Sequence, residues 1–360
     1  MSREQWNEIL EYGRWAPSAH NTQPWLFQFN EDDTITLIYD PKRLIPGTNP
    51  NGSFMAVGFG ILQETLAIAA APLGLDIEVS NQVKQLEADK EGPQHFAILK
   101  LIPRTKEETL DRALILNRRT SRLPYNGKPI TDDVMDELSK IAKTYDHLLE
   151  FSSEKSEVDW VIRLNSDTMF FDMSQTIARN EVGSWMRFSD EEAKQNADGL
   201  AAYAMQIPGF IMWLFVHANW LFRIPGVYQL VRWFYERTMS GTATVAWISG
   251  PFETPEDWNK AGRMMARLWL TMTQHKIYLH PFGSVITNNE AHQKMDEHFY
   301  NQDRENNLWM LVRLGYGNIP PQAQRLPLEK MIVPPNSTRF FKAPLETQNI
   351  SLDNEYQRAG

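Results

Sequence analysis

Hydrophobic and polar positions recur along the chain with two periods, and together they predict a mixture of helices and strands. Helices are expected where apolar residues recur near every 3.6 positions, over 3–15, 56–73, 105–116, 157–188 and 255–276, and from Thr131 onward. Strands are expected in short runs rich in β-branched and aromatic residues, at 35–39, 75–79, 95–102, 243–248 and 308–314. Both kinds of element are expected in each half of the chain.

Two of the predicted helices share a pattern. When the two segments are aligned so that Gly60 matches Gly262, Leu75 matches Ile277, and the residues of each pair are 202 positions apart. Each helix then runs into a strand-like segment. Chance alignment of two apolar helices is common, so the pattern alone leaves a true internal repeat and a coincidence both open.

Composition sets limits on the class of protein. At 360 residues, one large unit or two fused units of about 150 to 200 residues each are both compatible with the length. The 12 Trp, 18 Phe and 15 Met suit a large core or an apolar pocket for flat rings. A net charge of -9 argues against broad nucleic-acid binding. The N-terminus lacks a basic stretch followed by an apolar run, so no signal peptide and a cytoplasmic location are expected.

The absence of cysteine narrows the chemistry further. Disulfides, thiolate metal sites, iron–sulfur clusters and a Cys nucleophile are excluded, so redox chemistry would need a cofactor. The sequence shows no evident Ser-His-Asp set and no clustered metal ligands, and Glu290, His292 and His298 are too loosely arranged for zinc. We therefore expect no metal and no side chain acting as a nucleophile.

The first candidate site is the stretch 16–25, Ala-Pro-Ser-Ala-His-Asn-Thr-Gln-Pro-Trp. Its two prolines fix an irregular backbone, from which Ser18, His20, Asn21 and Gln23 offer short polar groups. These residues fit a rigid loop that binds a small polar ligand, and they equally fit a capped turn between a helix and a strand.

The second candidate site is basic. Arg118, Arg119 and Arg122, with the hydroxyls of Thr120 and Ser121, lie within five positions. Arginine matches phosphate oxygens in a bidentate way and is always charged, so the segment suits an anion. A solvated basic turn is the alternative.

These two motifs resemble the nitroreductase family. The pattern APSxxNxQPW is similar to the flavin-site signature of that family, and its form here resembles the single-chain Acg-type branch. The segment at 118–122, Arg-Arg-Thr-Ser-Arg, followed by Pro129-Ile130 and a helix, resembles the Arg-Arg-Ser-x-Arg segment with Pro-Ile or Pro-Val by which the family binds the phosphate of FMN. The resemblance implies an α+β fold with antiparallel-rich mixed sheets flanked by helices, and FMN as the cofactor.

The resemblance also implies which residues meet the cofactor. Ser18, Asn21 and Gln23 are expected near the flavin or in support of the loop, and His20 faces the same region. Arg118, Arg119, Thr120 and Arg122 belong to the phosphate segment, and Arg325 before Pro327 is expected to return to the phosphate. The turn after the 255–276 helix passes its backbone over the flavin ring, and its residues are Pro281, Phe282, Gly283 and Ser284.

The order of the motifs is unusual for the family. Nitroreductases open with the arginine segment, whereas here it begins at residue 118, after the Ser18 loop. Each half is therefore expected to hold one part of a single site, and the two fused halves mimic the nitroreductase dimer. We place the N-terminal half at 1–110, the C-terminal half at 111–340 and a tail at 341–360. A monomer or a weak homodimer is expected.

The C-terminal half carries an aromatic insert at about 203–240. Its apolar run within 207–235 is about fifteen residues long and contains His217 and Asn219, too short and too polar for the ~20 residues of a transmembrane helix. Three interpretations remain, namely a lid over an apolar substrate pocket, a membrane-surface helix, and core or dimer packing.

The family resemblance implies the function. We expect an FMN-dependent oxidoreductase with ping-pong hydride transfer through flavin N5, in which NAD(P)H is the expected donor. A nitroaromatic, a quinone or another small apolar or aromatic substrate is the expected acceptor. Two alternatives stay open, a flavin storage protein with a closed lid and a biosynthetic flavin-dependent dehydrogenase.

Overall fold

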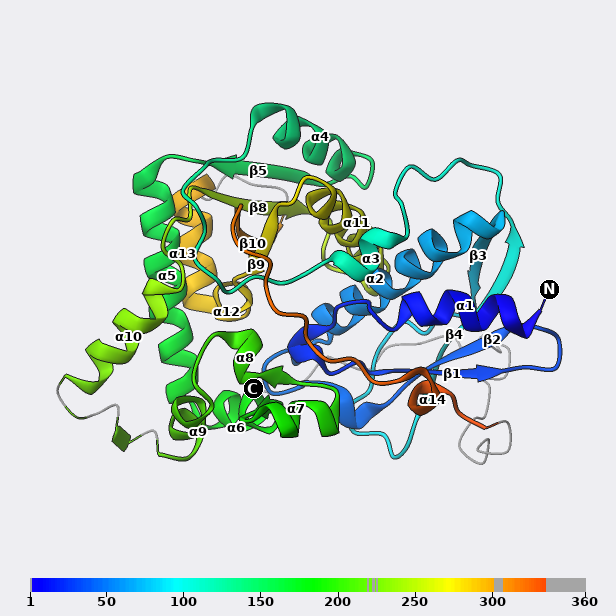
Figure 1. Cartoon of the computed structure of the whole chain (residues 1–360), viewed down its shortest axis with the longest axis horizontal. Helices are drawn as coiled ribbons and strands as arrows, with labels where there is room; N and C mark the ends of the chain where they lie inside the picture. Colours follow the sequence, from blue (N-terminus) through cyan, green and yellow to red (C-terminus); the bar gives the residue numbers. More distant parts are fainter. Residues whose placement is uncertain (1, 219, 222–223, 225, 301–306, 335–360) are drawn as a thin grey trace, which may run out of the picture.

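The computed structural model describes residues 2–218, 220–221, 224, 226–300 and 307–334. Two antiparallel sheets form its framework, and long helices lie between and around them (Figure 1). The predicted tail at 341–360 lies outside the described residues, and so does Asn219 of the aromatic insert.

The first sheet belongs to the N-terminal part of the chain. Its four strands run in the order β1-β2-β4-β3, and every neighbouring pair is antiparallel. Their bounds are β1 Trp25–Phe29, β2 Ile35–Tyr39, β3 Leu75–Ser80 and β4 Gln94–Pro103. Helix α1 (Arg3–Gly13) begins with a capping box between Ser2 and Gln5, and helix α2 (Ser53–Ala70) is buried along nearly its whole length.

The second sheet has the same design. Its strands run in the order β5-β8-β10-β9 and are again antiparallel throughout. Their bounds are β5 Leu148–Ser152, β8 Thr244–Gly250, β9 Tyr278–Pro281 and β10 Asn307–Gly315. Helix α4 (Asp132–Lys143) precedes β5, and α11 (Pro255–Gln274) links β8 to β9. Thr254 caps α11, and Pro255 stands at its first position.

The two sheets repeat each other in register. Strand β4 skips one residue between His95 and Ala97 where it pairs with β2, and β10 skips one between Leu308 and Met310 where it pairs with β8. Each skipped residue is a β-bulge. Leu99 lies four residues after His95 and pairs with Val79 of β3, and Val312 lies four residues after Leu308 and pairs with Pro281 of β9. Val79 and Pro281 are 202 positions apart, the offset found in the sequence. The internal repeat is therefore present in the fold.

Helices α2 and α11 cross at the centre of the molecule. A Cβ atom added to Gly60 would lie 3.0 Å from the Cα atom of Gly262 and 2.1 Å from the backbone oxygen of Asn259. Two residues that correspond in the repeat thus touch each other, as residues do on the axis of a twofold dimer. Arg267 on α11 adds an ion pair to Glu64 on α2 at 2.6 Å.

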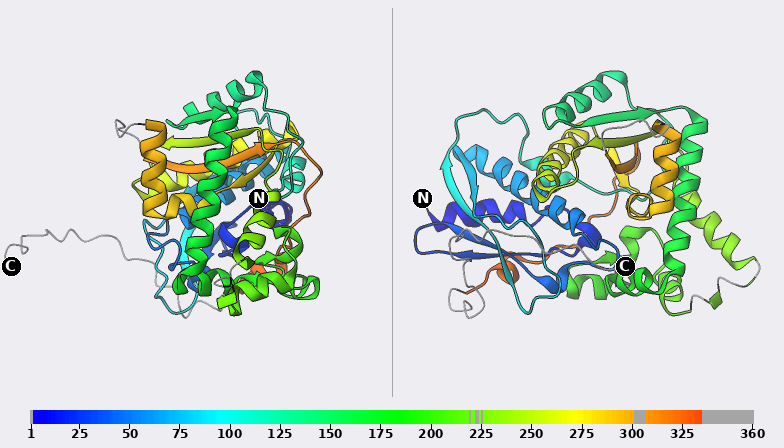
Figure 2. Two further views of the ribbon diagram at one scale, coloured as in Figure 1. Left: turned by 90° about the vertical axis from the view of Figure 1, so that its left-hand side faces the viewer. Right: turned by 180° about the vertical axis from the view of Figure 1, so that it is seen from behind.

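The remaining elements include those of the insert and short turns in both halves. They are α3 Ala113–Asn117, α5 Lys155–Ser174, α6 Thr176–Ser184, β6 Met186–Arg187, α7 Asp190–Asn196, β7 Leu200–Ala201, α8 Ala202–Met205, α9 Gly209–His217, α10 Val227–Arg237, α12 Gly283–Thr287, α13 Asn289–Tyr300 and α14 Leu328–Met331, with short 3₁₀ turns at Ala19–Asn21, Pro41–Arg43 and Ala71–Leu73. Figure 2 shows α5 running beside α13 at one end of the molecule, with α10 projecting beyond it.

Two predicted helices differ from the structure. The helix expected over 157–188 is broken at Gln175, whose backbone is extended, so that α5 and α6 are separate and the chain continues into β6. The helix expected over 105–116 is reduced to α3, because the Glu108 carboxylate accepts from the backbone N–H groups of Thr109 and Leu110 and holds them in a turn. The Asp111 carboxylate accepts from the backbone N–H of Ala113, where α3 begins.

After β10 the chain returns to the first sheet. The backbone N–H of Val333 donates to the carbonyl of Phe27 at 2.8 Å, and α14 packs near β1. The boundary between halves near residue 110 stays a prediction. Within the described residues, one segment, Ser53–Leu73, has the length and hydropathy of a membrane span, and 89% of its most apolar window is buried inside the fold.

Candidate functional site

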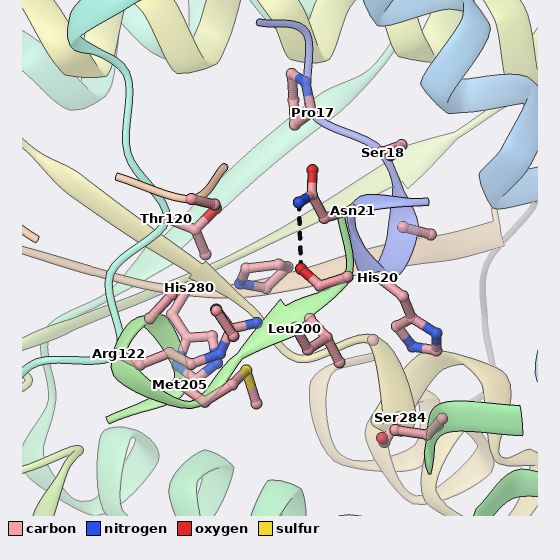
Figure 3. A pocket seen from close by; sticks show the side chains of 18 of the residues that line it. Pro17, Ser18, His20, Asn21, Thr120, Arg122, Leu200, Met205, His280 and Ser284 are labelled. Atoms are coloured by element: carbon pink, nitrogen blue, oxygen red, sulfur yellow. Dashed lines mark hydrogen bonds between the residues drawn. The ribbon is translucent and has the colours of Figure 1, made fainter. Parts of the chain in front are cut away.

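A cavity of about 450 Å³ lies between the two halves. Its walls combine the Ser18 loop, the start of α2, the arginine segment at 118–122, the turn after β9 and the inner side of α9 and α10. Figure 3 shows Pro17, Ser18 and Asn21 on one side of this space and Thr120, Arg122 and His280 on another. Four arginines line the cavity against one carboxylate, Asp172, so its lining favours an anionic ligand.

The Ser18 loop has an unusual backbone. His20, Asn21 and Gln23 all have positive φ angles, of 48°, 56° and 50°. Such angles are uncommon outside glycine, and a cluster of them is kept only where the surroundings hold it. The Ser18 hydroxyl helps to do so by accepting a hydrogen bond from the Gln23 backbone N–H at 2.8 Å.

Asn21 and Gln23 tie this loop to two distant segments. The Asn21 amide donates to the carbonyls of Gly199 and Gln324, each at 3.1 Å. The Gln23 amide donates to the carbonyl of Ala197 at 3.0 Å and accepts from the backbone N–H of Leu326 at 2.8 Å. Asn21 also lines the cavity, whereas Gln23 is fully buried and lies outside its lining.

His20 faces the cavity from the same loop (Figure 3). Its Nδ1 atom is buried and has no hydrogen-bond partner among the described residues. Burial lowers the pKa of His20 to about 4, although Glu181 opposes the shift and Arg122 adds to it. The imidazole is therefore neutral near pH 7 and has an unused polar atom, which suits a ligand contact.

Arg118 and Arg325 form the most unusual feature of the site. Arg118 Nη1 and Arg325 Nε are buried without a partner in the described part of the chain, and neither guanidinium has an ion pair there. Burial lowers the pKa of Arg325 to about 10, and the pKa of Arg118 is also lowered by burial and by the neighbouring arginines. Two buried cations with free donors predict a missing anion.

Arg119 and Thr120 complete the arginine segment. The Arg119 guanidinium donates to the carbonyls of Leu116 and Arg118, and burial lowers its pKa less than that of Arg118. Thr120 lines the cavity, where its backbone bridges to Leu279 at the start of the turn. Arg119 thus supports the segment while Thr120 offers a hydroxyl beside it.

Arg122 belongs to a second cationic group. It lines the cavity without a hydrogen-bond partner among the described residues, and burial lowers its pKa to about 10. Arg313 lies beside it and donates to His280 Nδ1 at 3.1 Å and to the carbonyl of Leu123 at 3.1 Å. Tyr235 of α10 faces the same region, and its hydroxyl accepts a hydrogen bond from Asn165 at 2.9 Å.

Some residues of the turn after β9 line the cavity, and one is buried in the core. Pro281, Gly283 and Ser284 line the cavity, whereas Phe282 is buried with Val285 and Leu311 in a separate apolar cluster. A Cβ atom added to Gly283 would meet nothing within 4 Å, so this position opens onto free space. A ligand could approach the backbone closely there.

The aromatic insert covers the cavity with apolar side chains. Met212 and Phe215 of α9, together with Val231 and Phe234 of α10, line it. This position is compatible with the lid interpretation. The inner face of these helices therefore suits an apolar ligand.

Sequence reasoning missed several residues that build the site. Asp198 accepts from Arg187 at 2.6 Å and from Arg43 at 3.0 Å, which fixes the turn that holds Asn21. Trp269 lies under Arg118, with 4.4 Å between the guanidinium carbon and the ring centre. His280, Arg313 and Trp269 sit in ordinary strand and helix patterns. No group of three or more metal-ligating side chains occurs among the residues that the structure describes.

This fold and site define a protein with two repeated halves that enclose a pocket for an anionic, partly apolar ligand. No family model matches the chain. Over 126 residues it is 32% identical to the "Putative NAD(P)H nitroreductase acg" of Mycobacterium tuberculosis, covering 34% of this chain and 36% of that protein. Over 115 residues it is 26% identical to an uncharacterized protein of the same organism, covering 31% and 33%. The chain thus spans about a third of the length of these relatives.

Solved structures with weaker similarity are also nitroreductases. The FMN-dependent nitroreductase NfnB of Mycobacterium smegmatis, solved with NADPH, has a TM-score of 0.37 and 15% identity, covering 64% of this chain and 96% of that one. A nitroreductase with bound FMN from Desulfitobacterium hafniense has a TM-score of 0.34 and 11% identity, covering 61% and 94%. The curated sequence match supports the nitroreductase family to which the motifs point.

Proposed function

We propose that the chain is an FMN-dependent oxidoreductase of the nitroreductase type, with one FMN in the cavity between its halves. The observation that carries the proposal is the pair of buried donors, Arg118 Nη1 and Arg325 Nε, that have no hydrogen-bond partner within the part of the chain that the structure describes. A phosphate group would satisfy both donors and neutralise the surrounding positive charge. The sequence similarity to a protein named as an NAD(P)H nitroreductase supports the proposed type of reaction.

The rest of the cavity fits the other parts of FMN. Gly283 leaves space beside the backbone of the turn, where a flat ring could pass closely. Asn21 Oδ1 and His20 Nδ1, which belong to residues of the cavity wall, are buried and have no hydrogen-bond partner among the described residues. They would satisfy polar edges of the ring system, while the apolar inner face of the lid would cover the reacting side.

FMN would supply hydride transfer from NAD(P)H to an acceptor, and the chain would supply position and charge. Arg122 would attract an acceptor with an oxygen atom, such as a nitro group or a quinone carbonyl. Among the described residues, the Tyr235 hydroxyl accepts from Asn165 and has no acceptor for its own hydrogen. Tyr235 would therefore donate a hydrogen bond to that oxygen, and the lid would exclude water.

The test starts from purified protein loaded with FMN and freed of unbound ligand. Rapid bleaching of the flavin absorbance on mixing with NADPH or NADH, and recovery of that absorbance with a quinone or nitroaromatic, is the expected result. Bound FMN that neither donor bleaches would favour the storage alternative. Protein that retains no FMN at all would remove the basis of the proposal.

A further inference from the structure

Large apolar side chains gather on the outer side of the aromatic insert. Eleven such side chains are exposed among the described residues, and six of them lie between 210 and 233. These six define the outer patch, and they are Phe210, Trp213, Trp220, Ile224, Leu230 and Trp233. Phe171 and Ile177 are also exposed, on α5 and α6, which contact α10 and α9. Clustering of this kind marks an interaction surface rather than chance exposure.

Helices α9 and α10 are apolar on two sides. In α10, Val231, Phe234 and Tyr235 line the cavity, while Leu230 and Trp233 face outward with exposed fractions of 65% and 55%. In α9, Phe210 is 68% exposed, and its neighbours Ile211 and Met212 line the cavity. Cavity packing therefore explains one side of each helix and leaves the outer patch without a partner.

Charge around the outer patch points to an anionic surface. The chain contains 45 Asp and Glu in 360 residues, yet none occurs from 199 to 235. Two acids beside α10, Asp167 and Glu236, are both paired with Arg232. Arg237 has no acidic partner within the described residues and lies over Trp233 at 5.3 Å. An otherwise acidic protein thus has an aromatic segment that contributes no acid of its own and ends beside the cation Arg237.

We propose that the outer patch docks on the surface of a lipid bilayer that contains anionic headgroups. Tryptophan favours the boundary between headgroups and acyl chains, and helices with basic and aromatic side chains lie in that boundary without crossing it. Helix α10 projects from one end of the molecule, and α9 lies beside α6 at the same end, so α10 can reach a flat surface ahead of the body (Figures 1 and 2). This docking is independent of the proposed chemistry, and it would turn the cavity cover toward the bilayer.

Vesicle flotation of the full-length protein tests the docking. Vesicles of phosphatidylcholine with a quarter phosphatidylglycerol are expected to carry the protein upward, and pure phosphatidylcholine vesicles are expected to carry less. Trp213→Glu on α9 and Leu230→Glu on α10 should each lower the lipid partition coefficient at least tenfold, because each places a carboxylate at the boundary. Tryptophan emission of the wild type should shift to shorter wavelength with the anionic vesicles.

The matched control is Ile319→Glu, which changes a 78% exposed apolar residue outside the outer patch and should leave partition unchanged. Thermal unfolding and FMN content of each variant confirm that the fold is retained. Wild-type protein that stays with neither vesicle type would overturn the proposal. A second result would also overturn it, namely a dimer of the wild type in lipid-free sedimentation that Trp213→Glu or Leu230→Glu dissociates. A second copy of the chain would then cover the outer patch.

Discussion

Individual side chains of the site carry an electrostatic cost that only a ligand removes. Arg118 is 8% exposed, and its single aromatic neighbour Trp269 offers weak attraction compared with a counter-ion. A buried cation without a partner destabilises the folded state. Ligand binding should therefore raise the stability of the protein as well as fill the cavity.

Removal of either buried guanidinium should weaken FMN binding. Arg118→Ala and Arg325→Ala each remove charge-assisted hydrogen bonds worth about 1.5 to 3 kcal/mol, which corresponds to roughly a 10- to 150-fold rise in the Kd for FMN. Arg119→Ala should have a smaller effect, because its donors already bind backbone carbonyls. Fluorescence titration of FMN into the apoprotein measures all three.

Arg112→Ala serves as the control for these variants. Arg112 pairs with Glu8 at 2.7 Å outside the cavity lining, so the Kd should stay as in the wild type. If Arg118→Ala and Arg325→Ala also keep the wild-type Kd, the phosphate lies elsewhere.

His20 should make the apoprotein sensitive to acid. Its pKa is about 4 in the folded state, below the ordinary 6.5, so the unfolded chain binds a proton first as pH falls. Stability is full above about pH 6.5 and is lost between pH 6.5 and 4, by on the order of 3 kcal/mol. Glu181 and Arg122 are the charged groups that act on the imidazole, with opposite signs.

Urea unfolding at pH 7.5 and 4.5 measures this loss. The free energy of unfolding of the wild type should fall by about 2 to 3 kcal/mol more than that of His20→Gln, which cannot take up the proton. Equal pH dependence in the two proteins would show that the imidazole is not held neutral by burial.

Among the elements, helices α2 and α11 approach each other so closely that their backbones are in contact. This contact depends on Gly60 and Gly262, where an added Cβ would meet backbone atoms at 2.1 Å. Backbone cannot move aside as a flexible side chain does, so even one methyl group must separate the two helices.

Gly60→Ala and Gly262→Ala should each lower the free energy of unfolding by about 1 to 3 kcal/mol or more. Gly58→Ala in the same helix is the control, because its added Cβ would have only contacts at 4.0 Å. That change should be neutral or stabilising by up to about 1 kcal/mol, from helix propensity. Chemical denaturation compares the three, and a loss for Gly58→Ala equal to the others would contradict the contact.

A second element-level prediction concerns the turn that holds the Ser18 loop. Asp198→Ala leaves Arg187, which is 9% exposed, without its carboxylate partner. Loss of one partner of a buried pair costs about 3 to 5 kcal/mol. Amide exchange should rise at 18–23 and 197–201, because Asn21 and Gln23 bind this turn. Asp190→Ala, at the exposed start of α7, should leave exchange there unchanged.

The elements with strong periodicity were predictable from the sequence. Strand β2 matches its predicted bounds, and α11 and β10 match within two residues, because each combines a clear hydrophobic pattern with a cap or turn. Strands β1 and β5 were not predicted, because neither short run stands out beside polar neighbours. Pairing with β2 and β8 decides their structure, and that information is not local.

At the scale of the whole molecule, the site is formed by segments far apart in the sequence. The motifs identified the Ser18 loop, the arginine segment and the turn at 281–284, and the structure brings them around one cavity. The cluster of Arg313, His280 and Tyr235 was not predictable, because its members come from β10, β9 and α10 and lack a shared motif. Only the folded arrangement shows that they meet.

One FMN should bind to each monomeric chain. The repeat supplies two sheets and one arginine segment, so a single cavity is equipped for a phosphate. Light scattering should give a mass near 41.7 kDa, and the flavin-to-protein ratio should be close to 1:1. Two flavins per chain, or a stable species of twice that mass, would contradict the single asymmetric site.

The contact between Gly60 and Gly262 also has an evolutionary consequence. In a homodimer one codon encodes both sides of the twofold axis, so each mutation is made twice and both active sites change together. In this chain the two glycines are separate codons, and so are all other corresponding positions. Selection could therefore preserve one pocket while the other drifted, and the long insert of the second half could grow without a copy of itself on the far side.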